Sequence, residues 1–294
     1  MGRDGQGLRH MRSDPLTIDH KPVDVSIVLV TFNRANFIRR TLETIAGQTY
    51  PYFEVLICDD CSTDNTEGIC QEFVTHDSRF KYLKNNENLR MPGNLNAGIR
   101  RARHEFIAIL HDGDIYAPTL IEKWRAALIK YPSAGFVFNR YRHLSKDGLS
   151  GLATGPFPEL MAGKDFLNRC FADRDLQCPV WGTVMARKAV YERIGLFDRR
   201  YGFFSDMDMW FRIAELFDVA HVPEVLIDLP HRAVMPHLFD KFNIVAHSTI
   251  FRIYWKAKIK HYRDEPLTVF AELAKQAWGY FISLAGRLLK KIRW

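Results

Sequence analysis

Three clusters of acidic residues in this chain of 294 residues have a spacing that suits the handling of charged ligands. In the first cluster, Asp112 and Asp114 lie on either side of Gly113, which allows close approach of a ligand to a tight turn. Because Mg²⁺ and Mn²⁺ prefer carboxylates together with substrate oxygens, this pair suits a divalent metal that bridges two phosphates. The alternative is an Asx turn or a helix cap ahead of Pro118.

The second cluster, Asp59 and Asp60, follows an apolar run, FEVLIC, that predicts a strand. A carboxylate at the end of a strand can accept a hydrogen bond from the ring N–H of a uracil or from a ribose hydroxyl, and we assign this role to Asp60. The alternative is that both acids are turn residues. Asp64 or Thr63 is expected to cap the helix that follows.

The third cluster is Ser205, Asp206, Met207 and Asp208. A helix that begins near Ser205 would bury Met209, Trp210, Ile213 and Phe217 as one stripe and place Asp206 in its first turn. An acid in that position is favoured by the helix dipole as a plain cap, but it also suits a general base if it stays ionised. Farther along the chain, His231 is a candidate ligand of a metal or phosphate, with a structural histidine as the alternative.

The elements that must position these acids alternate between strands and helices. This rhythm predicts βαβ units in a mainly parallel sheet, flanked by helices. The predicted strands are 23–30, 53–58, 80–84, 105–110, 135–141 and 181–186, and the predicted helices are 35–47, 66–76, 91–102, 118–130, 188–194 and 207–217.

A sheet of this type binds ligands outside the carboxyl ends of its strands, where the loops converge. Three loops should therefore lie on the same edge: Thr31 to Arg34, Asp59 to Ser62, and His111 to Asp114. Residues 146–158 are rich in Gly and Pro and are expected to form a loop over this site.

Taken together, these stretches resemble the family 2 glycosyltransferases of the GT-A fold. The resemblance covers about 23–232 and depends on motifs that follow one another in the family's order. These are SIVLVTFNR, QTYPYFEVLICDDCSTDNT, NLRMPGNLNAGIRRARHEFIAILHDGDIYAP, IGLFD and SDMDMWFRIAE. Each fragment alone is weak, whereas the ordered series is specific.

The resemblance implies a GT-A domain, a Rossmann-like nucleotide-binding mixed sheet flanked by helices, with a nucleotide-binding half at about 23–115 and an acceptor half at about 116–232. It implies that Thr31, Phe32, Asn33 and Arg34 line the nucleotide pocket and that Asp60 contacts the base. Asp112 and Asp114 would hold ribose and a Mn or Mg ion on the diphosphate, and Asp206 would be the catalytic base. The implied reaction transfers a sugar, most commonly from a UDP-linked donor, to a hydroxyl with inversion.

Four positions depart from the family pattern. Ser205 replaces the common Glu, Leu95 stands where many members have Arg, and His104 replaces a frequent Gly. Gly113 lies where a metal-binding Asp is common, so the sequence leaves open which of Asp112 and Asp114 contacts the metal. These departures motivate an alternative, a non-catalytic GT-A scaffold in a membrane-associated assembly. A nucleotidyltransferase is a further alternative, although TFNRANF lacks the glycines of a triphosphate loop.

The formal net charge of +7 is concentrated at the end of the chain. Residues 251–294 contain ten Lys and Arg against three acids, so the rest of the chain is neutral. A nucleic-acid-binding domain needs basic residues over its main surface, so this distribution excludes that class. With 47% hydrophobic and 26% charged residues, the composition is that of a globular protein.

Residues 233–294 are predicted to be a helical, basic C-terminal extension, amphipathic from about Leu267. Such a helix suits an anionic membrane surface, and the alternative is packing on the domain or in a homo-oligomer. Residues 1–22 read as a flexible leader without a secretory signal, and no run approaches the ~20 apolar residues of a membrane span. The five cysteines, an odd number, then favour a cytoplasmic protein, peripheral at most. A lipid-linked glycan is the acceptor that this location suggests.

Overall fold

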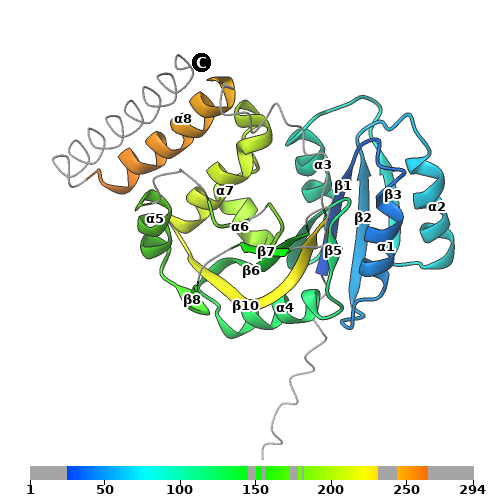
Figure 1. Ribbon diagram of the computed structural model, residues 1–294, viewed down its shortest axis with the longest axis horizontal. Helices are drawn as coiled ribbons and strands as arrows, with labels where there is room; N and C mark the ends of the chain where they lie inside the picture. The colour runs from blue at the N-terminus through cyan, green and yellow to red at the C-terminus, as the bar shows by residue number, and fades with distance from the viewer. Residues whose placement is uncertain are drawn as a thin grey trace, which may run out of the picture.

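The computed structural model describes residues 25–144, 150–153, 156–172, 178–180, 182–230 and 244–263. The described part is a mixed sheet of ten strands with helices on both of its faces (Figure 1). The predicted leader, His231 and most of the basic extension lie outside the described residues. The fold class predicted from the sequence, an α/β sheet flanked by helices, is confirmed.

The strands and helices alternate along the chain as the sequence indicates. The strands are β1 (Val25–Thr31), β2 (Phe53–Asp59), β3 (Phe80–Lys84), β4 (Phe106–His111), β5 (Ile115–Tyr116), β6 (Ala134–Leu144), β7 (Ser150–Ala153), β8 (Leu160–Met161), β9 (Val184–Arg187) and β10 (Asp218–Leu229). The α-helices are α1 (Ile38–Ala46), α2 (Thr66–His76), α3 (Gly93–Arg101), α4 (Leu120–Lys130), α5 (Gly163–Ala172), α6 (Lys188–Ile194), α7 (Ser205–Ala214) and α8 (Ile244–His261), with a 3-10 helix at Arg199–Phe204.

The first half of the chain forms the parallel part of the sheet, in the order β3-β2-β1-β4. Every residue of β1 and β2 is buried, which explains why both strands are continuous apolar runs rather than alternating ones. The register pairs Thr31 with Asp59 and Val30 with His111, so β1, β2 and β4 end together. The predicted βαβ units are therefore correct.

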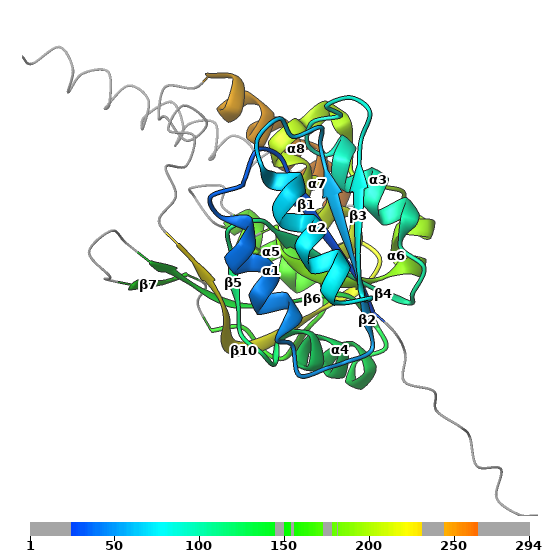
Figure 2. The ribbon, with the colours of Figure 1, turned by 90° about the vertical axis from the view of Figure 1, so that its right-hand side faces the viewer.

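The second half makes the sheet mixed rather than mainly parallel. Strand β9 is antiparallel to both β4 and β6, whereas β10 is parallel to β6 and antiparallel to β5 and β8. Strand β7 is antiparallel to the end of β6 and projects from the body (Figure 2). Residues 150–153 are thus a strand, although 146–158 was predicted to be a loop.

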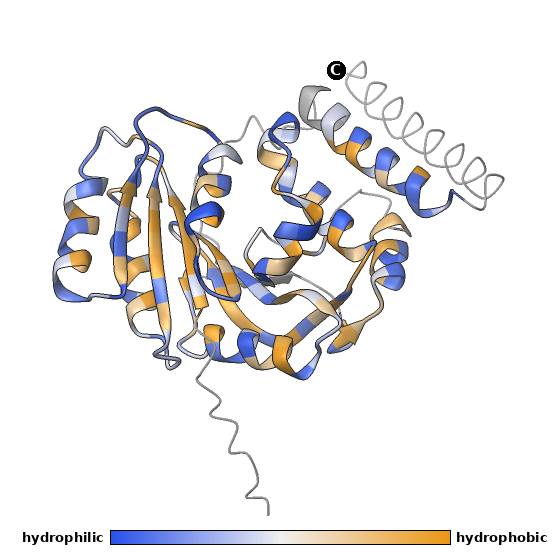
Figure 3. Cartoon of the chain, turned by 180° about the vertical axis from the view of Figure 1, so that it is seen from behind, coloured by the Kyte–Doolittle hydropathy of each residue, from blue (hydrophilic) through white to orange (hydrophobic). Residues whose placement is uncertain are grey.

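Two apolar cores lie on opposite faces of the sheet. Helices α1, α2 and α4 contribute to one core, and α3, α5, α6, α7 and α8 contribute to the other. The strands between them are strongly hydrophobic, and the helices present polar residues outward (Figure 3). A Cβ on Gly163 would lie 1.9 Å from the carbonyl oxygen of Ala214, so the start of α5 and the end of α7 are in backbone contact.

The five cysteines are free thiols. Burial raises the pKa of Cys58 to about 12, which disfavours the thiolate that a metal or redox role of the Cys58 and Cys61 pair would need. Among the described helices, none has both the length and the apolar character needed to cross a membrane.

Candidate functional site

The loops after β1, β2 and β4 lie on one edge of the sheet, as predicted, and are tied to one another by hydrogen bonds. Asn33, which has a positive φ of 52°, donates its backbone N–H to Ser62 Oγ at 2.9 Å and accepts the N–H of Thr63 on its Oδ1 at 2.8 Å. The backbone N–H of Arg34 donates to Thr66 Oγ1 at 2.9 Å. Asn33 therefore shapes this edge, and its side-chain oxygen is already used.

Other residues of the predicted nucleotide pocket have groups available to a ligand. The Phe32 ring is 42% exposed, and the hydroxyl of Thr31 is buried without a hydrogen-bond partner among the described residues. Arg34 is half-exposed, and its Nε lies 3.4 Å from Oδ1 of Asp112. An exposed aromatic residue and a guanidinium therefore follow the end of β1, and the buried Thr31 hydroxyl lies in its last residue.

The two acids after β2 hold neighbouring backbone in place. Asp60 accepts the N–H groups of Leu89 and Arg90, both at 2.8 Å, and the Nδ2 of Asn85 at 3.0 Å. Asp59 accepts the N–H of Ser62 at 2.8 Å and the hydroxyl of Tyr82. Both acids thus take part in turns, as the alternative interpretation predicted. Asp64 accepts the N–H of Thr66 at 3.0 Å, but the N-cap of α2 is Asn65, so neither Asp64 nor Thr63 is the cap that the sequence predicted.

The Asp112–Gly113–Asp114 turn is held from α1. Thr41 Oγ1 accepts the N–H of Gly113 at 2.8 Å and donates to the carbonyl oxygen of Asp114 at 2.9 Å. Gly113 has φ +80°, a left-handed conformation that glycine adopts without strain. The Asp114 side chain is 1% exposed and lies 3.5 Å from the hydroxyl of Tyr116, whereas Asp112 faces Arg34. The two carboxylates therefore have different surroundings.

The donor set of this turn can be compared with what a divalent metal requires. No group of three His, Cys, Asp or Glu side chains within the described residues could hold a metal alone. A Mg²⁺ or Mn²⁺ ion that binds with nucleotides usually has one or two carboxylates and takes its other ligands from phosphates and water. Asp112 and Asp114 fit this second kind of site.

Asp206 lies in the first turn of α7, as predicted, and faces the end of β4. An ideal Cβ on Gly182, just before β9, would lie 3.4 Å from Oδ2 of Asp206 and 2.7 Å from Cε1 of His111. The two side chains therefore converge on the same point from α7 and β4. Burial raises the pKa of Asp206 to about 6, because the charged form loses hydration, although its hydrogen bond from the N–H of Met207 opposes the shift.

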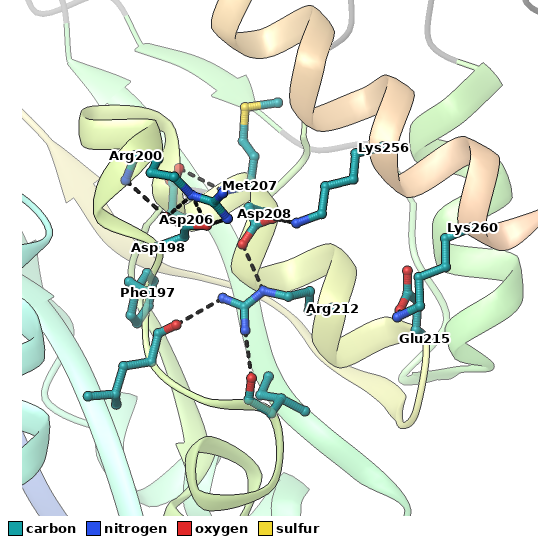
Figure 4. Close-up of polar contacts among 12 residues, drawn as sticks. Phe197, Asp198, Arg200, Asp206, Met207, Asp208, Arg212, Glu215, Lys256 and Lys260 are labelled. Atoms are coloured by element: carbon teal, nitrogen blue, oxygen red, sulfur yellow. Dashed lines mark hydrogen bonds and ion pairs between the residues drawn. The ribbon is translucent and has the colours of Figure 1, made fainter.

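The neighbouring acid, Asp208, fixes the start of α7 (Figure 4). Its carboxylate accepts Arg212 Nε at 2.7 Å and lies 3.4 Å from Lys256 Nζ of α8. The other Arg212 nitrogens donate to the carbonyl oxygens of Ile194 at 2.9 Å and Leu196 at 3.0 Å. This clamp ties α7 to the end of α6 and to α8, so it holds the helix that carries Asp206.

From the sequence, Asp60, Asp112, Asp114 and Asp206 could be assigned to the candidate site. The residues that hold these acids and their backbone in place were not identified. Thr41 and Gly182 lie outside the quoted motifs, and their partners are distant along the chain. Arg212 lies in SDMDMWFRIAE, but its contacts with Ile194 and Leu196 cannot be read from that motif. His111 was noticed only as part of its turn. His231, the remaining candidate ligand, lies outside the described residues.

Comparison with known proteins agrees with this arrangement. A family model described as Glycosyl transferase family 2 matches residues 26–195. The chain is 29% identical over 198 residues to "Putative glycosyltransferase EpsE" of Bacillus subtilis (strain 168), which is 65% of this chain and 66% of the relative. It is 30% identical over 132 residues, 45% of this chain and 51% of the relative, to "UDP-Glc:alpha-D-GlcNAc-diphosphoundecaprenol beta-1,3-glucosyltransferase WfgD" of Escherichia coli. The matched regions thus span about half to two thirds of these relatives.

Among solved structures, the fold of the chain is similar to that described as "Crystal structure of S. aureus TarS 1-349 in complex with UDP-GlcNAc". The TM-score is 0.62 at 17% sequence identity, over 80% of this chain and 66% of the other. The fold is that of the GT-A glycosyltransferases. Because the family model covers more than half of the chain, the protein belongs to glycosyl transferase family 2.

Proposed function

We propose that this protein transfers a sugar from a nucleoside-diphosphate sugar to a hydroxyl acceptor, with inversion at the anomeric carbon. The observation that carries the proposal is the position of Asp206. Its carboxylate and the ring of His111 face the same point beside Gly182, next to the edge where β1, β2 and β4 end. If the donor nucleotide lies along that edge, its sugar is near Asp206. A base in this position can accept the proton of an acceptor hydroxyl that attacks the sugar.

The donor would lie on the loops that follow β1, β2 and β4. Phe32 offers a ring for stacking, Thr31 a hydroxyl, and Arg34 a cation for the diphosphate. In this proposal, Asp60 contacts the nucleotide base. It already accepts three hydrogen bonds, but its two carboxylate oxygens offer about four acceptor sites, so one remains for the base. A UDP-linked donor agrees with the names of the E. coli relative and of the TarS complex.

A Mn or Mg ion would be held by Asp112, with Asp114 on the core side of the turn as the second carboxylate. When bound, the ion would offset the charge of the departing diphosphate. Arg34 helps to orient the same diphosphate from β1. The protein's own contribution is the fixed turn, which Thr41 holds through two hydrogen bonds to its backbone.

Asp206 is the proposed general base. A carboxylate with a pKa of about 6 is mostly ionised at neutral pH and is a stronger base than an ordinary aspartate. It accepts the proton of the acceptor hydroxyl as the oxygen attacks the anomeric carbon on the face opposite the diphosphate. The bond to the diphosphate breaks in the same displacement, so the product has the inverted anomeric configuration.

The proposed acceptor is a glycan or lipid-linked glycan at the cytoplasmic face of a membrane. The E. coli relative's name specifies a diphosphoundecaprenol-linked sugar, and the basic, amphipathic residues 267–294 would suit an anionic surface. Removal of 267–294 is expected to release the protein from vesicles that contain anionic lipid. Equal binding of both forms to these vesicles in sedimentation would disprove the membrane role of this segment.

The proposal is tested by incubating the purified protein with a panel of nucleotide sugars and measuring release of nucleoside diphosphate, with and without EDTA. We expect turnover with at least one donor, loss of turnover with EDTA, and recovery with Mn²⁺ or Mg²⁺. Thermal shift with the same panel identifies the nucleotide, because a ligand that binds only the folded state raises its stability. Nucleotide binding without any turnover would favour the non-catalytic scaffold instead.

A further inference from the structure

Strand β6 carries an arginine, Arg140, that the proposed function has not used. Asn139 accepts a hydrogen bond from Trp124 Nε1 at 3.1 Å on the α4 side of the sheet, so Arg140 lies on the opposite side, with α5 and α7. The Arg140 Nε is buried and has no hydrogen-bond partner among the described residues. A buried guanidinium N–H without a partner is costly, so its presence needs an explanation.

A second arginine approaches the same region from α5. The Arg169 guanidinium lies 4.0 Å from the centre of the Phe157 ring. The Phe157 ring is 5.5 Å from that of His221, which in turn is 4.8 Å from the ring of Phe138, two residues before Arg140 on β6. The aromatic rings thus connect the two arginines across β6 and β10. Within the described part of the chain, neither arginine forms an ion pair with a carboxylate.

Electrostatics agree with this arrangement. Burial, together with the charges of Arg140 and Arg169, lowers the pKa of His221 to about 4. His221 is therefore neutral at physiological pH, and both guanidinium groups are close enough to affect it. By contrast, the next arginine on β6, Arg142, is neutralised by a bidentate pair with Asp228, in which both N···O distances are 2.7 Å. The positive charge around His221 is left without a described counter-ion.

This region adjoins the proposed base. In the antiparallel ladder of β6 and β9, Phe136 pairs with Ala186 and Val137 with Met185. Extended three residues beyond the last pair of this ladder, the same register sets Arg140 opposite Gly182, the residue on which Asp206 and His111 converge. Arg140 therefore belongs to the same face of the sheet as Asp206 and as the His221 and Arg169 region.

We propose that Arg140 and Arg169 form an anion subsite that binds the diphosphate of the acceptor, a sugar diphosphate, while its hydroxyl faces Asp206. The inference rests on the proposed glycosyl transfer and names the class of acceptor. A guanidinium binds phosphate oxygens through paired N–H groups, which suits the unsatisfied Nε of Arg140. The subsite lies on β6 and α5, in the acceptor half, whereas the donor diphosphate is assigned to Arg34 and Asp112.

The geometry fits an acceptor of this class. The anomeric phosphate of a sugar and a hydroxyl on the far side of its ring are separated by the ring itself. Arg140 and Asp206 belong to the same face of the sheet, and the ring of His111 lies beside Asp206 at Gly182. In the proposal, the sugar ring bridges the two residues, with its phosphate on Arg140 and its hydroxyl on Asp206.

Binding of inorganic pyrophosphate to the UDP-saturated protein tests the subsite directly. We expect calorimetry to show pyrophosphate binding by the wild type that Arg140→Met weakens about 10- to 100-fold, the range for losing a charged hydrogen bond. Arg169→Met should weaken it less, because Arg169 is exposed. The matched control is Arg101→Met, an exposed arginine on α3 whose described hydrogen bond stays within its own helix. Equal affinity of the Arg140→Met variant and the wild type would overturn the proposal.

Kinetics with two acceptors then test the assignment to the acceptor. One is N-acetylglucosamine with an α-linked octyl diphosphate, and the other is its octyl glycoside without phosphate. Arg140→Met should raise KM about 10- to 100-fold for the diphosphate acceptor and leave KM for the glycoside unchanged. Arg140→Lys should recover part of the loss, because it retains the charge. Equal increases for both acceptors, or an increase in KM for the nucleotide sugar instead, would overturn the acceptor assignment.

The two proposals fail in distinguishable ways. If the wild type turns over no nucleotide sugar, glycosyl transfer fails, but the pyrophosphate titration still decides whether Arg140 binds a diphosphate. If the wild type transfers sugar and its Arg140 variants keep the same preference between the two acceptors, the subsite fails and glycosyl transfer stands. UDP affinity and melting temperature verify that each variant is folded.

Discussion

Two buried acids near opposite edges of the parallel sheet, Glu54 and Asp206, have opposite surroundings. At the amino edge, Glu54 near the start of β2 accepts Ser26 Oγ at 2.9 Å, Lys81 Nζ at 2.7 Å and Arg103 at 3.0 Å. Burial alone would raise the pKa of Glu54, but Lys81, Ser26 and Arg103 together lower it to about 2. Every element at this edge thus contributes to keeping one carboxylate ionised.

At the carboxyl edge, the pKa of Asp206 is raised to about 6. Its own described hydrogen bond is the backbone N–H of Met207, and the nearby cations Arg212 and Lys256 bind Asp208 instead. The comparison teaches that a satisfied carboxylate stabilises the fold, whereas an unneutralised one has basicity left for a substrate. Glu54 therefore serves stability, whereas Asp206, as the proposed base, would serve chemistry.

The largest expected effect comes from Asp206→Asn, which removes the proposed base and keeps the shape. Transfer should fall by about 10²- to 10⁴-fold, the usual contribution of general base catalysis. Nucleotide binding should stay nearly unchanged, because Asp206 lies on the acceptor side. Steady-state rates together with UDP titration measure both quantities. Retention of full activity would eliminate Asp206 as the base.

The next largest effect is the loss of stability expected for Glu54→Gln. The variant keeps a partner for Ser26 but loses both ion pairs, and we expect a cost of about 2 kcal/mol after allowance for the exposure of Lys81 and Arg103. Because the pKa of Glu54 is lowered, the difference should be full above about pH 4.5 and should disappear as the pH falls to about 2.

Urea unfolding of both proteins at several pH values measures this difference. Glu72→Gln is the matched control, because its ion pair with Arg39 is exposed and should be worth less than about 1 kcal/mol. Transfer activity should be normal in both variants. A change in kcat for folded Glu54→Gln would contradict the division between the two edges.

The pH dependence of transfer gives the third prediction. With Asp206 as the base at a pKa of about 6, kcat should be level near neutral pH and fall about tenfold per unit well below pH 6. Rates measured between pH 4.5 and 8 test this expectation, provided that the protein remains folded by circular dichroism. A kcat that stayed constant down to pH 4.5 would contradict this prediction. It would mean that the base has the pKa of an ordinary aspartate or that no group titrating in this range is the base.

The smallest effect is a gain in stability from Asp206→Asn. A raised pKa means that the folded protein holds the proton more tightly than the unfolded chain, so ionised Asp206 destabilises the fold increasingly as the pH rises from about 4 through about 6. Removing the charge should stabilise the protein by about 1 kcal/mol at pH 7 and not below pH 4. Thermal unfolding at both pH values shows whether the gain disappears in acid.

Local patterns predicted the first half of the sheet well, because its elements are set by nearby residues. Helix α2 begins and ends where the sequence indicated, and β1 and β2 are apolar runs that end in polar loops. In the second half, α6 also has the predicted bounds. Helix α5 was missed, because it begins at a glycine without a capping residue and its apolar face is short. Ahead of His231 the sequence indicates a strand without clear bounds, and β10, whose register shifts around Pro223 and Glu224, is that strand.

In the candidate site, too, the sequence predicted local features but not the contacts between residues that are distant along the chain. Acids at strand ends could be assigned to one edge from the alternation of elements alone, and the start of α7 followed from its apolar stripe. The contact of Gly182 with both His111 and Asp206, and the hydrogen bonds from Arg212 to Ile194 and Leu196, depend on tertiary packing. No spacing in the sequence encodes such contacts.

The close packing of Gly163 has a mechanical consequence. Since the start of α5 packs against the backbone of Ala214, the last residue of α7, and of Phe217 just after it, these helices cannot slide past each other without a collision. This contact would fix the distance between Arg169 on α5 and Asp206 on α7. In the proposal, that distance would select acceptors by the separation between their phosphate and their reacting hydroxyl. Selectivity for linkage would then originate far from the reacting atoms.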